Sequence, residues 1–402
     1  MRIKQAALAL VAAVAAAGPV QADVRATIDS AFTDLQAARR SGDRIRTLTA
    51  ARRMAAAAPD NPVIRTFLAR FAAAAGDQAL AVETLTWLAD RGYGVDARAR
   101  PDLKHVLSAP GNRNLVRRLD ANLRAVGGVS GLAPISGGLD SEGVDYDSRR
   151  DRLYVADASG VYAVGADGTA ELVGGGEALK DRFVLGVRRH PKGDNIFVCS
   201  SARPDTGEKA AELVVIDAAD PRRVERFDLG PSSGTRLCND VAVLDDGAAI
   251  TDTNTGEVLR YRFGGGVERF GRTLFTYPNG AVRVGDVVVV ADLLGLWALD
   301  LNGNLLGPLR GEDGAYIGGM DGLAADGHRL YGVQNLTAPA RVVSFRLGSD
   351  LVLRDRRVIA SALPELQGMT TATLQGDEIV VLSRPAGATE PPPKALVRFK
   401  AR

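Results

Sequence analysis

The spacing of apolar residues changes once along the chain, near Gly127. Between Asp23 and Asn122 these residues recur at steps of three and four, which is the period of amphipathic helices. The turn signals SGD, PDNP, AGD and RGYG separate the helical segments, and Pro62 stands where the first turn of a helix tolerates proline. We therefore predict a small all-α domain of helical hairpins over residues 23–125.

The hairpin expected over residues 61–92 leaves two interpretations open. It is similar to a tetratricopeptide repeat, although it lacks the large aromatic residues at most positions of that motif. A tetratricopeptide-like domain would offer a docking surface for a protein partner. The alternative is a plain helical bundle that packs on the rest of the chain. Neither interpretation assigns catalytic chemistry to this region.

Beyond Gly127, short apolar runs alternate with Gly, Asp and Asn turns, which predicts β-strands. One pattern recurs over residues 141–157, 185–201, 239–253, 279–292, 321–334 and 367–383. The copies are spaced 43, 54, 40, 42 and 46 residues apart. Periods near forty with four short strands each are typical of propeller blades. The predicted fold class is mainly β, with a six-bladed β-propeller over residues 129–402.

The last of these repeats lacks a fourth strand. The chain ends on the third strand, ALVRFKAR, and offers nothing after it. We expect the segment VSGLAPI at 129–135 to supply the missing strand, which would close the ring and leave no open sheet edge.

Each repeat begins with a residue directly before a glycine-like position, and we call these six residues the channel-end positions. They are Glu142, Leu185, Asn239, Asn279, Asp321 and Gln367. Because the first strand of every propeller blade lines the central channel, these residues should meet at one end of it. Turn chemistry explains an Asn-Gly or Asp-Gly pair on its own. It does not explain Glu142 at the same position, nor the absence of Lys and Arg from all six.

The channel-end positions therefore predict a bound cation. Glu142, Asn239, Asn279 and Asp321 bring hard oxygen donors into one small space, where uncompensated like charge would be unfavourable. A divalent cation held by carboxylate and amide oxygens removes that problem. We favour calcium, with zinc, magnesium and manganese as alternatives.

A second set of polar residues follows the channel-end positions at a fixed step. Asp252, Asp292 and Gln334 each lie 13 residues after one of them, at the end of the second strand. Two interpretations remain open. These side chains either orient the metal ligands by hydrogen bonds or cap the turns at which they stand.

The N-terminus has the layout of a secretory signal peptide. Arg2 and Lys4 precede an apolar run, and the small-residue site VQA ends at Ala22. We predict a signal peptide at 1–22 and a periplasmic or secreted protein that is not inserted in the membrane after cleavage. The balance of 50 Lys and Arg against 48 Asp and Glu, with only 5% aromatic residues, argues against a nucleic-acid partner.

The two cysteines bear on the same compartment. Cys199 and Cys238 both fall at the channel end of neighbouring repeats, and neither belongs to a CxxC motif. In an oxidising compartment they could pair as a disulfide that ties two blades together. Two free buried thiols are the alternative.

The motifs SEGVDYD, LCNDVAV, YPNGAVRV and MDGLAADG carry a family resemblance. The β region resembles the six-bladed propellers of the senescence marker protein, regucalcin and gluconolactonase family. That resemblance implies a divalent ion at the channel mouth and the opening of lactone rings there. It makes Glu142, Asn279 and Asp321 metal ligands, with Asp321 also the candidate general base. It places Asn239 and Asp240 in contact with substrate or a metal-bound water.

The chain departs from the family pattern near the expected substrate. Val144 replaces a usual Pro, Val241 replaces a usual Gly, and Arg236 lies three residues before Asn239 instead of two. We still expect Arg236 to hold a substrate oxygen, but the metal site carries over better than specificity for sugar lactones.

Two functions are consistent with these features. The first is an exported metal-dependent hydrolase that opens a small lactone or related ester at the cation. The second is a non-catalytic periplasmic binding or scaffold propeller in which the ion is structural.

Overall fold

The computed structural model describes residues 17–95, 100–203, 205–206, 208, 210–232, 234–385 and 392–401. Most of the predicted signal peptide at 1–22 lies outside these residues, and the first described helix begins at Ala17. Within the described ranges, no helix is both long enough and apolar enough to cross a bilayer.

The N-terminal part of the chain is helical, as predicted. Its helices are α2 (Ala17–Arg40), α3 (Arg44–Ala57), α4 (Pro62–Ala74), α5 (Gln78–Asp90), α6 (Lys104–Ser108) and α7 (Arg113–Asn122). The side chains of Asp43, Asn61 and Asp77 begin α3, α4 and α5, because each accepts hydrogen bonds from the first free backbone N–H groups. Fully buried alanines such as Ala69 and Ala72 let these helices pack closely around a shared core.

The rest of the chain is β-structure built from short antiparallel strands. The first half contains β1 (Gly131–Pro134), β2 (Gly143–Asp147), β3 (Arg152–Asp157), β4 (Gly160–Val164), β5 (Ala170–Gly174), β6 (Arg182–Arg189), β7 (Asn195–Ala202), β8 (Ala211–Asp217), β9 (Val224–Asp228), β10 (Cys238–Leu244), β11 (Gly247–Asp252), β12 (Val258–Arg262) and β13 (Val267–Arg269). The second half contains β14 (Ala281–Val284), β15 (Val287–Ala291), β16 (Leu296–Asp300), β17 (Leu305–Gly311), β18 (Leu323–Asp326), β19 (Arg329–Gln334), β20 (Arg341–Leu347), β21 (Val352–Ser361), β22 (Thr371–Gln375), β23 (Glu378–Ser383) and β24 (Ala395–Lys400). One short helix, α8 (Gly176–Leu179), follows β5.

The strands pair mainly with their neighbours in sequence. Three four-stranded sheets have the orders β2–β3–β4–β5, β6–β7–β8–β9 and β10–β11–β12–β13. The eight-stranded sheet consists of β14–β17 and β18–β21, joined through parallel pairing of β17 with β21. In the last sheet β1 pairs with β24, so the predicted contribution of segment 129–135 to the C-terminal strands is confirmed.

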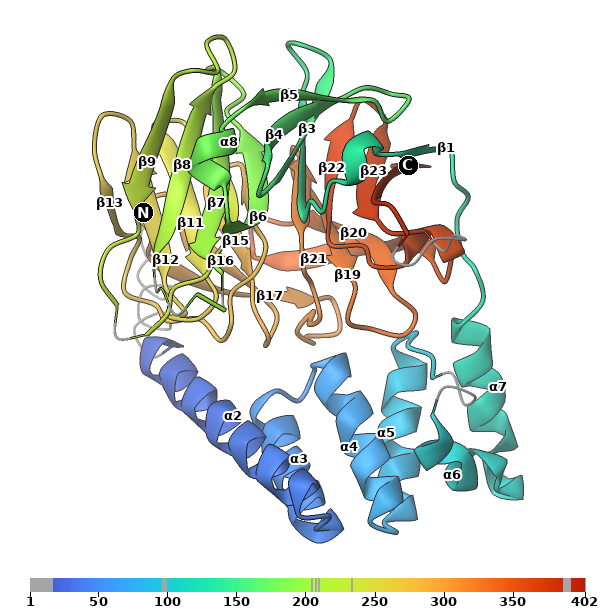
Figure 1. Ribbon diagram of the computed structural model, residues 1–402. Helices are drawn as coiled ribbons and strands as arrows, with labels where there is room; N and C mark the ends of the chain where they lie inside the picture. Colours follow the sequence, from blue (N-terminus) through green and yellow to red (C-terminus); the bar gives the residue numbers. More distant parts are fainter. Residues whose placement is uncertain are drawn as a thin grey trace, which may run out of the picture.

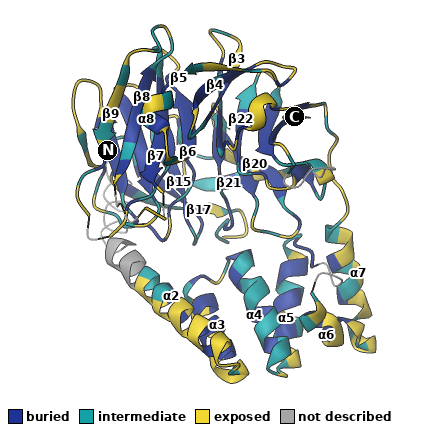
Figure 2. Cartoon of the chain, viewed as in Figure 1, coloured by how far each residue is buried: buried dark blue, intermediate teal, exposed yellow. Residues whose placement is uncertain are grey.

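The first strands of these units lie side by side in a closed circuit. Strand β2 contacts β6, and contacts continue from β6 to β10, β14, β18 and β22, which in turn contacts β2. Figure 1 shows the strand units standing side by side above the helical region, and Figure 2 shows that the strands of the β region are mostly buried. The predicted mainly β, propeller-like arrangement is therefore confirmed.

Glycines allow the inner strands to approach one another. A Cβ at Gly280 would lie 2.1 Å from the carbonyl oxygen of Asp321 on the next unit. At Gly143 and Gly186 it would lie 2.6 and 2.7 Å from backbone oxygens of the neighbouring strand, and Gly322 is similarly crowded. None of these four glycines has a positive φ. The glycine of the repeated pattern is thus required by close strand contact, not by turn geometry.

The helical region packs against the end of the circuit at which the inner strands begin (Figure 1). Backbone and side-chain hydrogen bonds join the two parts, including Arg25 to Phe275 O at 3.0 Å and Gly94 N to Ala338 O at 2.6 Å. This arrangement agrees with the second interpretation of the helical hairpins, in which the bundle packs on the rest of the chain.

Substitution of Gly280 by alanine should destabilise the fold. The added Cβ must displace the backbone at Asp321, and overpacking of this kind costs about 1–3 kcal/mol. Denaturant unfolding of Gly280→Ala measures the loss. Gly266→Ala is the control, because a Cβ there meets nothing within 4 Å. Equal stability of the two variants would contradict the close-contact explanation.

Candidate metal centre

The structure brings the channel-end positions together. Glu142, Leu185, Asn239, Asn279 and Asp321 all line one cavity of about 260 Å³ at the end of the circuit. These residues come from five different strand units and are separated by up to 179 positions in the sequence. The oxygen donors for which we predicted a cation therefore share one space.

The sixth position is not the one that the sequence alignment chose. Thr370, and not Gln367, lines the cavity, because β22 begins at Thr371. Thr370 Oγ1 donates a hydrogen bond to Glu142 O at 2.9 Å, so it takes the place that the pattern assigns to the sixth unit. The alignment of the last repeat is wrong by three residues, because Thr371 occupies the crowded position that glycine fills elsewhere.

Asp321 is held by amide groups. Asn335 Nδ2 donates a hydrogen bond to Asp321 Oδ2, and the side chain of Asn279 also donates to this carboxylate. Burial is the main reason that the pKa of Asp321 is raised to about 7. The negative charges of Glu142 and Asp240 act in the same direction, and the two amide donors act against it. Without a cation, this carboxyl group is partly protonated near neutral pH.

Glu142 has a basic partner that sequence reasoning missed. Lys394 Nζ lies 3.1 Å from Glu142 Oε1, and the lysine side chain is only 1% exposed. Lys394 directly precedes β24, so it enters the cavity region from the last sheet and not from a channel-end position. The absence of Lys and Arg from the channel-end positions therefore did not mean that no basic group reaches this space.

Arg188 forms the floor of the cavity and is the second basic residue that sequence reasoning missed. Its buried guanidinium donates to Val144 O at 3.2 Å, to Leu323 O at 2.9 Å and to Asp240 Oδ2 at 3.0 Å. These partners lie on three other inner strands, so the side chain crosses the channel. It also borders a second cavity of about 440 Å³ toward the other end.

A signal for Arg188 was present in the sequence. It stands three residues after Leu185, and the residue at the same step after Glu142 is Asp145. Charged residues on an inner strand should have indicated an ion pair inside the channel. Burial raises the pKa of Asp145, and the positive charge of Arg188 opposes that rise.

Asp240 lines the cavity, but its oxygens already have partners. One accepts from Val241 N at 2.8 Å, and the other accepts from Arg188 and from Ala281 N at 3.2 Å. Asp240 occupies the position on its strand that Gly143 and Gly186 occupy on theirs. Where those glycines only contact the next strand, Asp240 accepts a hydrogen bond from it, from Ala281 N. Asp240 therefore joins adjacent strands whether or not it also meets a substrate.

Asn239 is oriented by its own second strand. Its Nδ2 donates to Thr253 Oγ1 at 2.9 Å, and Thr253 Oγ1 donates to Pro278 O at 2.7 Å. Thr253 lies 14 residues after Asn239, and Asn335 lies 14 residues after Asp321. For Asn239 and Asp321, the orienting residue thus follows at a step of 14 and not of 13.

The residues at the step of 13 hold backbone groups. Asp252 Oδ1 accepts from Leu237 N at 3.0 Å, and Asp292 Oδ2 accepts from Thr276 N at 3.0 Å. Gln334 Nε2 donates to a backbone carbonyl at 2.7 Å. Of the two interpretations, turn capping is the one that these contacts support.

Arg236 is not among the cavity-lining residues. It is buried, and its guanidinium donates to Asp252 Oδ2 at 2.6 Å, to Glu257 Oε2 at 2.8 Å and to Gly230 O at 2.8 Å. These contacts anchor the loop that leads into β10. The structure therefore does not bring Arg236 to the predicted ligands.

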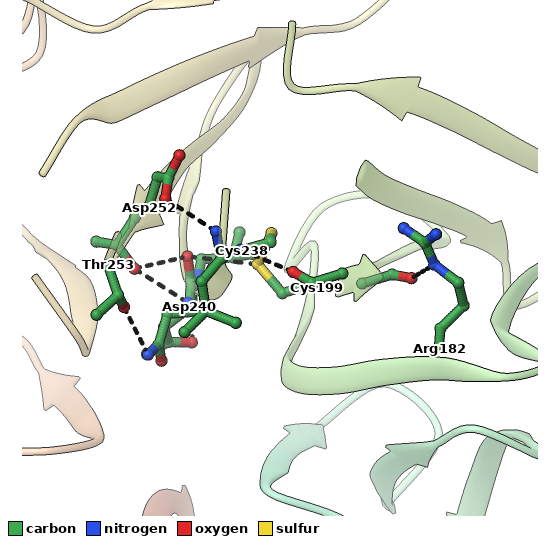
Figure 3. Close-up of a disulfide and its surroundings, with 12 residues drawn as sticks. Arg182, Cys199, Cys238, Asp240, Asp252 and Thr253 are labelled. Atoms are coloured by element: carbon green, nitrogen blue, oxygen red, sulfur yellow. Dashed lines mark hydrogen bonds between the residues drawn. A yellow bond between two sulfur atoms is a disulfide. The ribbon is translucent and has the colours of Figure 1, made fainter. Parts of the chain in front are cut away.

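Cys199 and Cys238 form a disulfide with a Cα–Cα distance of 5.1 Å. It joins β7 to β10, which belong to neighbouring sheets, as Figure 3 shows. Of the two alternatives for these cysteines, the disulfide is the one found. Because Cys238 directly precedes Asn239, the cross-link holds the start of the strand that carries this predicted ligand.

The donor set suits a hard cation. Two carboxylates, from Glu142 and Asp321, and two amide oxygens, from Asn239 and Asn279, are the ligand types that calcium prefers. Within the described residues, no group of three or more His, Cys, Asp and Glu side chains is placed to hold a metal.

Comparisons with known proteins show no family. No family model matches the chain, and no curated protein matches it. The PQQ-bound aldose sugar dehydrogenase of Streptomyces coelicolor is 13% identical, with 69% of this chain and 99% of that chain covered and a TM-score of 0.43. A streptogramin B lyase is 10% identical, with coverage of 67% and 97% and a TM-score of 0.41. A nidogen/laminin complex is 12% identical, with 58% of this chain and 85% of that chain covered and a TM-score of 0.41. Similarities this weak carry no argument about activity, and the resemblance to the regucalcin family stays a prediction.

Removal of the disulfide should lower stability. Replacement of Cys199 and Cys238 together by serine releases a cross-link between residues 39 positions apart, and such losses typically cost about 2–4 kcal/mol. Denaturant unfolding with and without reductant measures the change. Reductant should shift the wild-type midpoint and leave the double variant unchanged. A wild-type protein that is insensitive to complete reduction would contradict this expectation.

Proposed function

We propose that the β region is a six-bladed propeller and that the protein is an exported hydrolase that opens a lactone or related ester at a divalent cation. The observation that carries this proposal is the convergence of Glu142, Asn239, Asn279 and Asp321 on one cavity. Calcium is the favoured ion because of the oxygen donors, with magnesium, manganese and zinc as alternatives.

These four residues would hold the ion, which supplies Lewis acidity for a carbonyl oxygen when bound. Asp321 is placed to take a proton from an attacking water because it lines the cavity. A bound cation would lower the pKa of this carboxyl group, so its placement beside the reacting water would matter more than its basicity. Asn335 and Asn279 fix the orientation of that carboxylate. Lys394 forms an ion pair with Glu142 at 3.1 Å.

The cavity walls favour a partly apolar substrate. Phe183, Leu185 and Leu237 line the cavity between Glu142 and Asn239 in the order of the units, and Phe183 is 39% exposed. The basic residue expected to hold a sugar oxygen, Arg236, is occupied elsewhere. We therefore propose a lactone or ester with an aliphatic or aromatic substituent in preference to a polyhydroxylated sugar lactone.

Export to the periplasm or beyond the cell is supported by the disulfide. Cys199 and Cys238 form a buried cross-link of the kind that persists in oxidising compartments. This agrees with the signal-peptide pattern at 1–22. Both features point to a folded protein outside the cytoplasm.

A second candidate function is a non-catalytic binding or scaffold propeller with a structural ion. It is favoured by the internal ion pairs, because Glu142 is matched by Lys394 and Asp240 by Arg188. Such pairing would hold the inner strands together without any chemistry. The protein partner would then dock on the helical region.

Lactone hydrolysis distinguishes the two candidates. We expect the wild-type protein to open δ-decalactone faster than glucono-δ-lactone, and a chelator should abolish both reactions. Asp321→Asn should lose at least about 100-fold in kcat/KM because it removes the base and one ligand charge together. Circular dichroism checks that the variant is folded. Full activity of Asp321→Asn, or chelator-resistant hydrolysis, would overturn the assignment.

Cation affinity should depend on pH through Asp321. Its pKa is raised to about 7, so below that pH the carboxyl group must release a proton before it can bind a cation. Affinity for calcium should therefore fall as pH decreases through 7, by roughly tenfold per unit once the group is mostly protonated. Titration calorimetry at pH 5.5 to 8.5 measures the slope. Asp321→Asn should flatten it, and an unchanged slope in that variant would assign the proton to another group.

A further inference from the structure

The helical region contacts the same end of the strand circuit as the candidate metal centre. Its contacts are not spread evenly over that end. They fall on segments beside three of the four predicted ligands, namely Asn239, Asn279 and Asp321. A helical region that positions these ligands requires contacts at such places. A loosely tethered docking module does not require them.

The segment that leads to Asn279 is held by α2. Arg25 Nη1 donates to Phe275 O at 3.0 Å, its guanidinium lies over the Tyr277 ring, and Tyr277 Oη donates to Asp29 Oδ1. A second bond from Arg25 reaches Asn254 O, beside the threonine that orients Asn239. The Arg25 side chain thus bonds to the backbone beside two predicted ligands. One bond is on the segment before Asn279, and the other is next to Thr253, which orients Asn239.

The segment that leads to Asp321 is held by the start of α4. Asp60 Oδ2 accepts from Tyr316 N at 3.2 Å. Asn61 packs so closely on Gly318 that a Cβ there would lie 3.3 Å from Asn61 Cα. Asn61 Nδ2 also donates to Leu293 O, and Leu293 N donates to Thr276 O on the approach to Asn279.

A second connection reaches the same segment through buried polar groups. Arg341 Nη1 donates to Gly92 O at 3.1 Å, and its guanidinium stacks on the Tyr93 ring. Arg341 Nε donates to Gln334 Oε1 at 2.7 Å, and Gln334 Nε2 donates to Gly318 O at 2.7 Å. Arg341 and Gln334 are only 2% and 1% exposed, so water does not compete for these bonds.

We propose that the helical region is a positioning element of the candidate metal centre, with Asn61 and Arg25 as its principal positioning residues and Arg341 of β20 as the residue that receives its contacts at Gly92 and Tyr93. It fixes the backbone segments that deliver Asn279 and Asp321, and through them the distance between the predicted ligands. The metal-dependent part of this inference rests on the proposed function.

Asn61→Ser separates positioning from helix stability. Serine caps a helix about as well as asparagine but is too short to keep the bond to Leu293 O. Asp43→Ser is the matched control, because among the described residues the side chain of Asp43 bonds within the start of α3, to Arg46 N. Calcium titration of the folded proteins should show affinity weakened roughly three- to tenfold in Asn61→Ser and unchanged in Asp43→Ser. Equal affinities in the two variants would contradict the positioning role in metal binding.

Hydrogen exchange without added cation tests the inference independently of the proposed function. Peptides that cover 275–279 and 316–321 should exchange faster in Asn61→Ser than in the wild type, and not in Asp43→Ser. If Asn61→Ser fails to fold, Arg341→Lys replaces it, because lysine keeps the charge and cannot bridge Gly92 and Gln334 together. Unchanged exchange in both segments overturns the inference even if calcium binds. A wild-type protein that binds no divalent cation contradicts the proposed function, and the exchange result alone then decides the inference.

Discussion

Close contact between the inner strands is the constraint on which the rest of the structure depends. Where Gly280 faces Asp321, there is no room for a side chain between the two backbones. Such contact buries the first residues of each strand and directs the residue before the glycine toward the channel end. The repeated residue-plus-glycine pattern is therefore one feature with two effects. The glycine sets the spacing of the strands, and its neighbour supplies the side chain that lines the cavity.

The same closeness gathers acidic groups that need compensation. The structure supplies it partly from within, since Lys394 pairs with Glu142 and Arg188 pairs with Asp240. Both basic side chains are almost completely buried, so each one needs its acidic partner to balance its charge. Arg188 also donates to backbone carbonyls of several inner strands, and so it stabilises the circuit as well as the charge.

The sequence was sufficient for the periodic features and insufficient for the long-range ones. Helices, short strands, the pairing of 129–135 with the C-terminal strand and the convergence of Glu142 with Asp321 all follow from periods that the chain repeats. Lys394 and Arg236 belong to no repeat. Their partners depend on which loop happens to lie beside which strand end, and no local pattern encodes that. The last repeat was misaligned for a related reason, because threonine there replaces the glycine that marks the other units.

The charge pairing also sets Asp321 apart from the other carboxylates of the cavity. Among the described carboxylates of the cavity, Glu142 and Asp240 each have a basic partner, whereas Asp321 is held by the amides of Asn335 and Asn279. A buried carboxylate without a countercharge is costly for stability, which its raised pKa reflects. A purely structural site would gain by replacing Asp321 with an amide. Under the proposed function, a cation or a transferred proton supplies the missing positive charge at this position.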